Sequence, residues 1–109
     1  MNSIKEIHSY ETICIIKPDL NEDSLAKIIE IYQLILIDQG AKNIVTQNRG
    51  RRHLKYVIKK SKDGIYIQMN YEANGAIISV LEKNMKIDEQ IIRFMTVKNS
   101  IKEKVEIPN

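Results

Sequence analysis

The sequence is poor in aromatic residues, cysteine and glycine, and each shortage excludes a class of function. It has no Trp and one Phe, which disfavours an aromatic cage or a base-stacking platform. Its single cysteine, Cys14, excludes an internal disulfide framework and any cysteine-based metal cluster. The four glycines occur singly, without the spacing of a phosphate-binding loop. No apolar run is longer than four residues, so no segment is predicted to span a membrane.

The length and composition predict one globular domain. A chain of 109 residues with 43% hydrophobic and 28% charged residues is too short for two domains with full cores. Residues 1–9 are predicted to form a leader without a signal or transit peptide, residues 10–98 the domain, and residues 99–109 a polar tail. The 21 Ile, 13 Lys and 9 Asn are residues with AT-rich codons, which favours a plastid or a reduced bacterium as the source.

The basic residues are unevenly distributed along the chain. The net charge is only +3, yet eight Lys and Arg residues lie between Lys42 and Lys62 with no acidic residue among them. The remaining 9 basic residues are outnumbered by 14 acidic ones. So local an excess of positive charge indicates a polyanionic partner, although a solvated cationic hairpin is the simpler alternative.

The apolar pattern predicts a β-α-β-β-α-β order. Strands are predicted over residues 10–16, 42–60, 65–71 and 91–97, with a hairpin turn at residues 61–64. Helices are predicted from the N-cap Asn21 to about residue 39, where Gly40 ends the helix, and from residue 75 to about residue 86 after Asn74. The fold class is therefore α+β, a ferredoxin-like split βαβ arrangement with a four-stranded antiparallel sheet and both helices on one face.

One face of the predicted sheet is left without helices. Alternation places Tyr10, Thr12, Cys14 and Ile16 under the helices and turns Ile13 and Ile15 the other way. On the third strand, Tyr66 also points away from the helices. We therefore expect a bare apolar face that a partner covers.

No catalytic or metal site can be built from these residues. Cys14 lies in an apolar strand, where a buried and inert thiol is the default interpretation. His53 has no acidic neighbour in the sequence to orient it, and His8 lies in the polar leader. The sequence therefore predicts no enzyme activity, no cofactor and no small-molecule substrate.

The basic segment, in contrast, has the chemistry of a phosphate-binding surface. Guanidinium groups bind phosphates through two parallel hydrogen bonds. On a regular strand Arg49, Arg51 and His53 share one side with Lys55, whereas Arg52 points the opposite way, unless Gly50 introduces a bulge. An RNA recognition motif is disfavoured, because Tyr66 is followed on its face by Gln68 and Asn70 rather than by aromatic residues.

Several motifs resemble one known family. Residues 50–59 (GRRHLKYVIK) are similar to the signature of the sixth protein of the bacterial small ribosomal subunit. Further similarity lies in residues 10–12, 17–20, 40–41, 64–66 and 92–98, in the same order as in that family. The resemblance covers residues 10–98. Lys55 and Val57 depart from it, because the family prefers a small residue and often proline at these positions.

The resemblance implies a structural protein of the small ribosomal subunit with a ferredoxin-like fold. Such a protein binds the central domain of the 16S rRNA as a heterodimer with the eighteenth protein of that subunit. The expected RNA-binding residues are Arg49, Arg51, Arg52, His53, Lys55 and Lys59, followed by Arg93 and Lys98. The expected partner-binding residues are Ile13, Ile15 and Tyr66. Codon usage favours a plastid (chloroplast) ribosome over the cytoplasm of an AT-rich bacterium.

Two other functions fit the same fold. A regulatory ferredoxin-like domain would bind an anionic small ligand in a compact pocket at the basic hairpin. An enzyme of the acylphosphatase type would need an arginine in a phosphate-binding loop after the first strand, where this sequence has Lys17-Pro18-Asp19.

Overall fold

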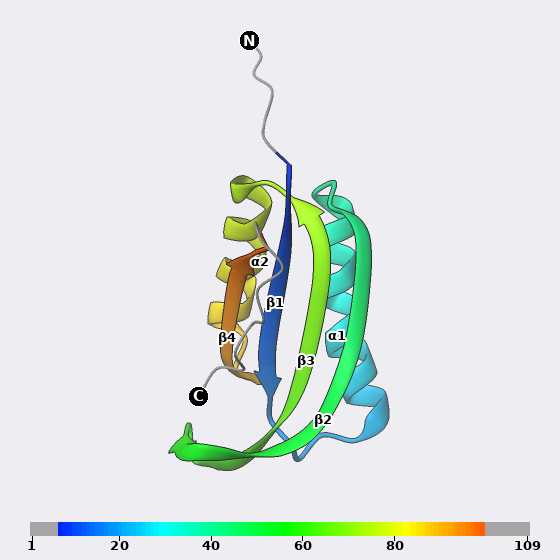
Figure 1. Ribbon diagram of the computed structural model, residues 1–109. Helices are drawn as coiled ribbons and strands as arrows, with labels where there is room; N and C mark the ends of the chain where they lie inside the picture. Colours follow the sequence, from blue (N-terminus) through cyan, green and yellow to red (C-terminus); the bar gives the residue numbers. More distant parts are fainter. Residues whose placement is uncertain (1–6, 100–109) are drawn as a thin grey trace.

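The computed structural model describes residues 7–99, and these form two layers, a sheet and a pair of helices, from elements in the predicted order (Figure 1). The elements are β1 (His8–Ile16), α1 (Glu22–Asp38), β2 (Lys42–Ile58), β3 (Ser61–Ala73), α2 (Gly75–Ile87) and β4 (Ile91–Lys98). Residues 1–6 of the predicted leader (1–9) lie outside the described residues, and His8 and Ser9 belong to β1, so the strand starts two residues earlier than predicted. Of the predicted polar tail (99–109), only residue 99 is described. The β-α-β-β-α-β prediction is confirmed.

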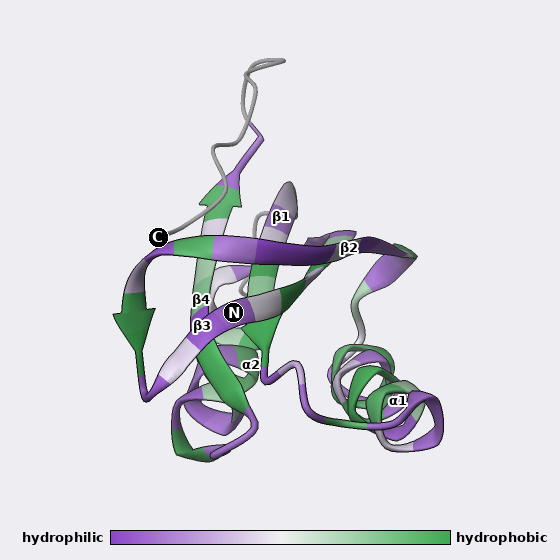
Figure 2. Cartoon of the chain, turned by 90° about the horizontal axis from the view of Figure 1, so that it is seen from below, coloured by the Kyte–Doolittle hydropathy of each residue, from purple (hydrophilic) through white to green (hydrophobic). Residues whose placement is uncertain are grey.

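The four strands form one antiparallel sheet in the order β2-β3-β1-β4. Both helices lie on the same side of this sheet, as the view from below shows (Figure 2). The helix boundaries follow the predicted caps, since the Asn21 side chain accepts a hydrogen bond from the Ser24 amide at 2.8 Å. Gly40 ends α1 with a φ of 93°, a conformation that favours glycine.

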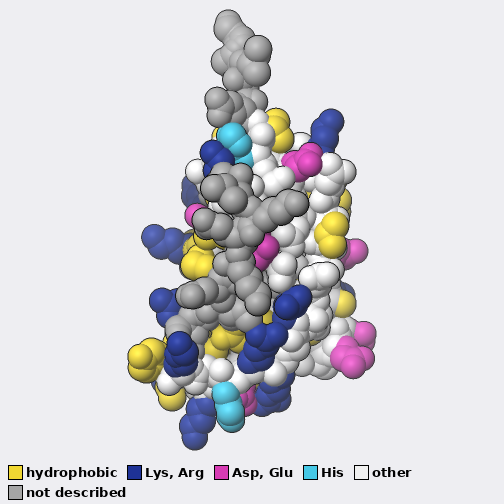
Figure 3. Space-filling model, in the orientation of Figure 1, with side chains coloured by type: hydrophobic (Ala, Val, Ile, Leu, Met, Phe, Trp, Pro, Cys, Tyr) yellow, Lys and Arg dark blue, Asp and Glu magenta, His cyan; other side chains and the backbone are white. Residues whose placement is uncertain are grey.

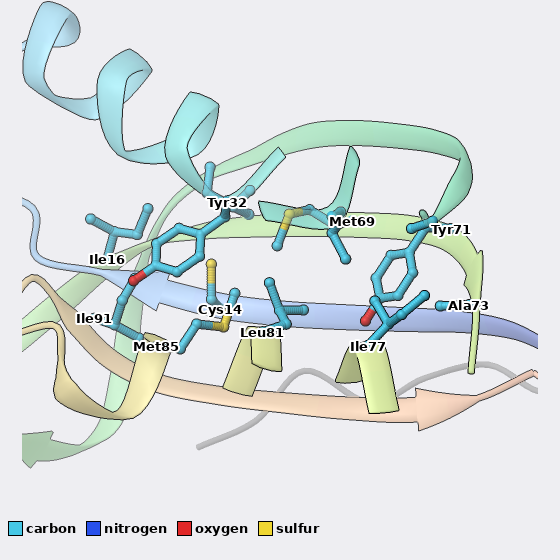
Figure 4. Packing of buried hydrophobic residues seen from close by; sticks show 13 residues of the cluster. Cys14, Ile16, Tyr32, Met69, Tyr71, Ala73, Ile77, Leu81, Met85 and Ile91 are labelled. Atoms are coloured by element: carbon cyan, nitrogen blue, oxygen red, sulfur yellow. The ribbon is translucent and has the colours of Figure 1, made fainter. Parts of the chain in front are cut away.

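The main core lies between the sheet and the helices (Figure 4). Cys14 is buried there as expected, and burial raises the pKa of its thiol to about 12, so that it stays protonated near neutral pH. Thr12 is the one buried polar residue described, and its hydroxyl hydrogen-bonds to Tyr71 at 2.6 Å and to Thr96 at 2.8 Å. These bonds join β1, β3 and β4 and satisfy the buried hydroxyl group. None of the described helices is long and apolar enough to cross a membrane.

A second, smaller hydrophobic cluster lies on the opposite face of the sheet. It consists of the buried side chains of Ile13, Ile15, Tyr66 and Ile92. Ile13 and Ile15 point away from the main core, as predicted. The prediction that they lie on a bare face is wrong, because Ile13 is 3% exposed and Ile15 0% exposed in the chain itself. Leu54 and Ile58, from the far part of β2, pack against the cluster.

The β2–β3 hairpin supplies these covering residues because its far end bends across the sheet towards β4 (Figures 1 and 2). The bend is tied down at its tip, where the Lys59 Nζ donates a hydrogen bond to the Ile91 carbonyl oxygen at 3.1 Å. The hairpin is therefore longer than the sheet it belongs to, and the extra length folds back over the face without helices.

The turn of this hairpin differs from the prediction. Ile58 pairs with Ser61, so Lys59 and Lys60 form a two-residue turn, and residues 61–64 belong to β3. Lys59 and Lys60 have φ values of 48° and 65°, as a type I′ turn requires. Each residue with a Cβ in this conformation costs roughly 1–2 kcal/mol, a strain that Asn-Gly would largely avoid. The sequence suggested the wrong turn because Asp63-Gly64 is a stronger turn signal than Lys-Lys.

Gly64 is required for packing and not for the turn. A Cβ at this position would lie 2.2 Å from the Ile15 Cγ2 and 3.6 Å from the Ile16 carbonyl oxygen. The Ile15 side chain occupies the space that a side chain at position 64 would need. Gly64 thus leaves room for Ile15 within the second cluster.

We expect the Gly64→Ala substitution to lower the free energy of unfolding by about 1–3 kcal/mol, because the added methyl group overpacks Ile15. Urea denaturation measures this change. Gly75→Ala is the matched control, since a Cβ there meets nothing within 4 Å and alanine favours the first turn of α2. Equal stability of the two variants would contradict the close packing at Gly64.

Candidate RNA-binding surface

The basic residues of the chain gather around the far end of the β2–β3 hairpin. Figure 3, which views the face without helices, shows Lys and Arg side chains over the lower part of this face. Because β2 is an edge strand, only one side of its backbone is paired within the sheet. The sheet thus carries the cationic segment along one border and then across the end of the molecule (Figures 1 and 2).

A bulge in β2 decides on which side of the hairpin each arginine lies. Asn48 pairs with Ile67 and Gly50 with Tyr66, so Arg49 is the extra residue, and Gly50 has a φ of 91°. The Arg49 Nη1 lies 3.4 Å from the Gln47 Oε1. Gln47 pairs with Gln68, which in turn pairs with Ile13. The bulge therefore places Arg49 on the open face and separates it from Arg51.

Arg52 lies on the open face together with Arg93. Arg52 pairs with Gly64, and its guanidinium carbon is 5.5 Å from the centre of the Tyr66 ring, a cation–π contact. Arg93 pairs with Ile15 and is exposed. Burial raises the pKa of Tyr66, whereas the charges of both arginines lower it. The open face therefore has a cationic rim around the second cluster.

Arg51 and His53 lie on the opposite side of the hairpin. Arg51 pairs with Ile65 and His53 with Asp63. The Arg51 Nη2 donates to the Asp63 Oδ2 at 3.1 Å, and the His53 Nδ1 contacts the Asp63 Oδ1. The expectation that His53 has no acidic neighbour is wrong, because strand pairing brings Asp63 to it. The predicted separation of Arg51 from Arg52 is observed, and the bulge does not undo it because it precedes both residues.

Between the hairpin tip and the loop that joins β1 to α1, a groove of about 500 Å³ is lined mainly by polar and charged residues. The hairpin contributes one wall, and the loop between β1 and α1 contributes the other. The lining residues are Lys17, Pro18, Asp19, Arg51, Lys59, Lys60, Ser61, Lys62 and Asp63. Sequence reasoning did not include Lys17, Lys60 and Lys62 in the site, because only the bend of the hairpin brings them together.

The remaining expected residues lie at different distances from this cluster. Lys55 is exposed near the hairpin end, next to the exposed side chains of Tyr56 and Val57. Lys98 pairs with Tyr10 and lies five residues from Arg93, about 16 Å away along β4. The structure therefore places Arg49, Arg52 and Arg93 on the open face and Arg51 and His53 on the opposite side of the hairpin, with Lys98 at the other end of β4 from Arg93.

The described residues contain no group of three or more His, Cys, Asp or Glu side chains that could hold a metal ion. The groove lining has one hydroxyl-bearing residue, Ser61, and no histidine. The surface can neutralise phosphates and contact sugars or bases.

Comparison with known proteins identifies the family. The family model described as ribosomal protein S6 matches residues 9–98. The chain belongs to the ribosomal protein S6 family. Its relatives are structural ribosomal proteins and not enzymes, in agreement with the expectation from the sequence.

The relatives include plastid-type and bacterial proteins. The chain is 64% identical over 91 residues to the small ribosomal subunit protein bS6c of Guillardia theta, an alignment that covers 84% of this chain and 95% of the relative. It is 46% identical over 88 residues to the small ribosomal subunit protein bS6 of Cyanothece sp., covering 81% and 83% of the two chains.

A solved structure shows the same fold. The 30S ribosomal protein S6 of Thermotoga maritima matches with a TM-score of 0.79 at 26% sequence identity, covering 85% of this chain and 88% of the other. The ferredoxin-like fold expected from the sequence is thereby confirmed.

The ion pair across the hairpin gives a pH-dependent prediction. The hydrogen bond from Arg51 holds the pKa of Asp63 below its usual range, and His53 adds to this effect. The stability that this pairing contributes is present above the ordinary pKa of Asp and is lost as the pH falls through the lower value of the folded chain.

We expect Arg51→Ala to raise the pKa of Asp63 in the folded chain towards its ordinary value, because the main donor to the carboxylate is lost. Carbon-detected NMR titration of the Asp63 carboxyl group measures this shift. Arg52→Ala is the control, since Arg52 lies on the opposite side of the hairpin and should leave the pKa of Asp63 unchanged. An equal shift in both variants would show that the two arginines do not face opposite sides.

Proposed function

We propose that the chain binds small-subunit (16S) rRNA in its central domain as a structural component of the ribosome. The observation that carries this proposal is the clustering of cations at the end of the hairpin, where one acidic residue, Asp63, is held by Arg51 and His53. So many cations on a single projecting element match a polyanionic partner better than they match a need for solubility. Membership of the ribosomal protein S6 family supports the same conclusion.

The two sides of the hairpin have different roles in this proposal. On the open face, Arg49, Arg52 and Arg93 present guanidinium groups that can form two parallel hydrogen bonds with a phosphate. On the other side Arg51 is already bound to Asp63, so its contact with RNA exchanges or shares that partner. His53, which is 87% exposed, adds hydrogen bonds to phosphate or sugar, and Lys55 and Lys59 add positive charge. Lys98 takes no part in the same contact because it lies at the far end of β4.

We expect the affinity for rRNA to depend steeply on salt. If about four to six phosphates are neutralised, the slope of log K against log[salt] is roughly −3 to −5. Filter binding of the full chain to the central-domain rRNA at several salt concentrations measures it. A slope near zero would contradict contact through phosphates.

We further propose that the open face binds a protein, the eighteenth protein of the small subunit. The first strand's Ile13 and Ile15, together with Tyr66, were the expected contacts, but they are buried beneath the hairpin end. Their role in this proposal is therefore to hold the face in shape. Direct contact is left to their exposed neighbours. One of these is Val45, which is 54% exposed and pairs with Asn70, a residue whose side chain hydrogen-bonds to Glu11 at 3.1 Å.

We expect Val45→Asp to weaken binding of that protein at least tenfold, because a charge replaces an exposed apolar residue at the interface. Isothermal titration calorimetry with the purified partner measures this change. Ile87→Asp is the matched control, since Ile87 is also apolar and is even more exposed, at 74%, but lies at the end of α2, on the helix side. Equal affinities for the two variants would exclude this face as the interface.

A plastid ribosome is the proposed location. Relatives named bS6c come from the algae Guillardia theta, Porphyra purpurea and Pyropia yezoensis, and the composition favours an AT-rich genome. Sedimentation of a tagged chain on a sucrose gradient of plastid ribosomes tests this proposal. We expect the chain to travel with the small subunit, and its absence from that peak would contradict the assignment.

A further inference from the structure

The groove below the hairpin tip is a structural feature distinct from the arginine cluster of the open face. Each wall is held by a hydrogen bond to a backbone carbonyl group. The Lys17 amide donates to the Gln90 carbonyl oxygen at 3.0 Å, and the Lys59 Nζ donates to the Ile91 carbonyl oxygen at 3.1 Å. Both walls are thus fixed to the same segment, the start of β4. The groove is therefore built into the fold and does not depend on the side chains of the open face.

The groove has more positive than negative charge. Its lining includes the four lysines Lys17, Lys59, Lys60 and Lys62, the arginine Arg51, and the acids Asp19 and Asp63. Asp63 is already bound by Arg51 and His53. Within residues 7–99, neither Lys17 nor Lys60 nor Lys62 forms an ion pair. A concave surface with uncompensated cations concentrates anions.

The backbone at the hairpin tip is strained at Lys59 and Lys60. Lys59 and Lys60 occupy both positions of a two-residue turn with positive φ, where Asn-Gly would form the same turn with less strain. Strained backbone of this kind is found mainly where function requires it. Here the strain keeps two ammonium groups at the edge of the groove.

The lining also indicates which kind of anion fits. Sites for nucleotides and metabolites are mostly apolar, with a few placed polar groups that hold the base or ring. Pro18 is the only apolar residue in this lining, and no aromatic residue is present to stack on a base. Lysine ammonium groups bind phosphate as point charges, without reading its orientation. Such a surface suits the backbone of an RNA strand.

We propose that this groove binds the phosphate backbone of a second RNA segment, separate from the segment contacted by Arg52 and Arg93 on the other side of the hairpin. The inference rests on the proposed rRNA-binding function and extends it. The hairpin is inserted between two RNA segments, and the protein joins them.

The first test removes the charges of the groove. The variant Lys17→Gln/Lys60→Asn/Lys62→Gln keeps the turn, because Asn is favoured at positive φ. The control Lys27→Gln/Lys42→Gln/Lys83→Gln removes three exposed lysines that do not line the groove. We expect the slope of log K against log[salt] for rRNA binding to become less negative by about 2 to 3 in the groove variant. In the control variant, the slope should change by less than about 1. Equal slopes for the two variants would overturn the groove proposal and leave the proposed function intact.

The second test does not depend on rRNA binding. Inorganic tripolyphosphate is added to the ¹⁵N-labelled full chain at low salt, and amide shifts are followed by NMR. We expect shifts at Lys17 and at residues 59–62 whose midpoint concentration differs from that of any shifts at Arg52 and Arg93, because the two surfaces bind phosphate independently. No shift at Lys17 and residues 59–62, or one common midpoint for both sides of the hairpin, would overturn a separate groove site.

Combining both tests separates the failure of the two proposals. If tripolyphosphate binds in the groove but the wild-type chain does not bind rRNA, the proposed function fails and the groove is a site for small anions. The other outcome is that the wild-type chain binds the rRNA fragment but the amide NMR signals of the groove residues do not shift. In that case the groove does not bind RNA, and the proposed function still holds.

Discussion

The bend of the β2–β3 hairpin over the sheet is the constraint on which the rest of the structure depends. Leu54 and Ile58 cover the second cluster, and Ile15 of this cluster fills the space next to Gly64, where a Cβ would be 2.2 Å from the Ile15 Cγ2. This burial offsets part of the strain of the Lys59-Lys60 turn.

The same bend explains how a chain with a net charge of only +3 presents a concentrated cationic surface. Basic residues spaced along a flat edge strand would be far apart and individually hydrated. Folded across the end of the sheet, they form two surfaces, with Arg52 above Tyr66 on one side and Arg51 with Asp63 on the other. The groove lining has two acidic residues, Asp19 and Asp63, against five basic ones, so binding of an anion there relieves the repulsion between the cations.

Burial of Ile13 and Ile15 changes how a protein partner on the open face is understood. A bare apolar face would make the isolated chain prone to aggregation and dependent on its partner for stability. With the hairpin end covering this cluster, the domain has two hydrophobic clusters of its own. A partner would then bind a surface whose apolar cluster is already buried within the chain, and the core would not need the partner. Its binding is expected to depend on the exposed residues around the cluster, such as Val45.

The sequence alone determined the features that rest on local interactions. The caps at Asn21 and Asn74, the end of α1 at Gly40 and the alternation along β1 depend on neighbouring residues, and all were predictable. The motifs around residues 50–59 were sufficient to indicate the family. Tertiary structure decided the features that depend on pairing between distant residues. Gly64 had the signature of a turn residue, but its contact with Ile15 comes from β1, and the partnership of His53 with Asp63 comes from the register of the hairpin. Lys17 joins Lys60 and Lys62 only when the hairpin bends, because strand register and close packing are properties of the folded chain and not of any short segment.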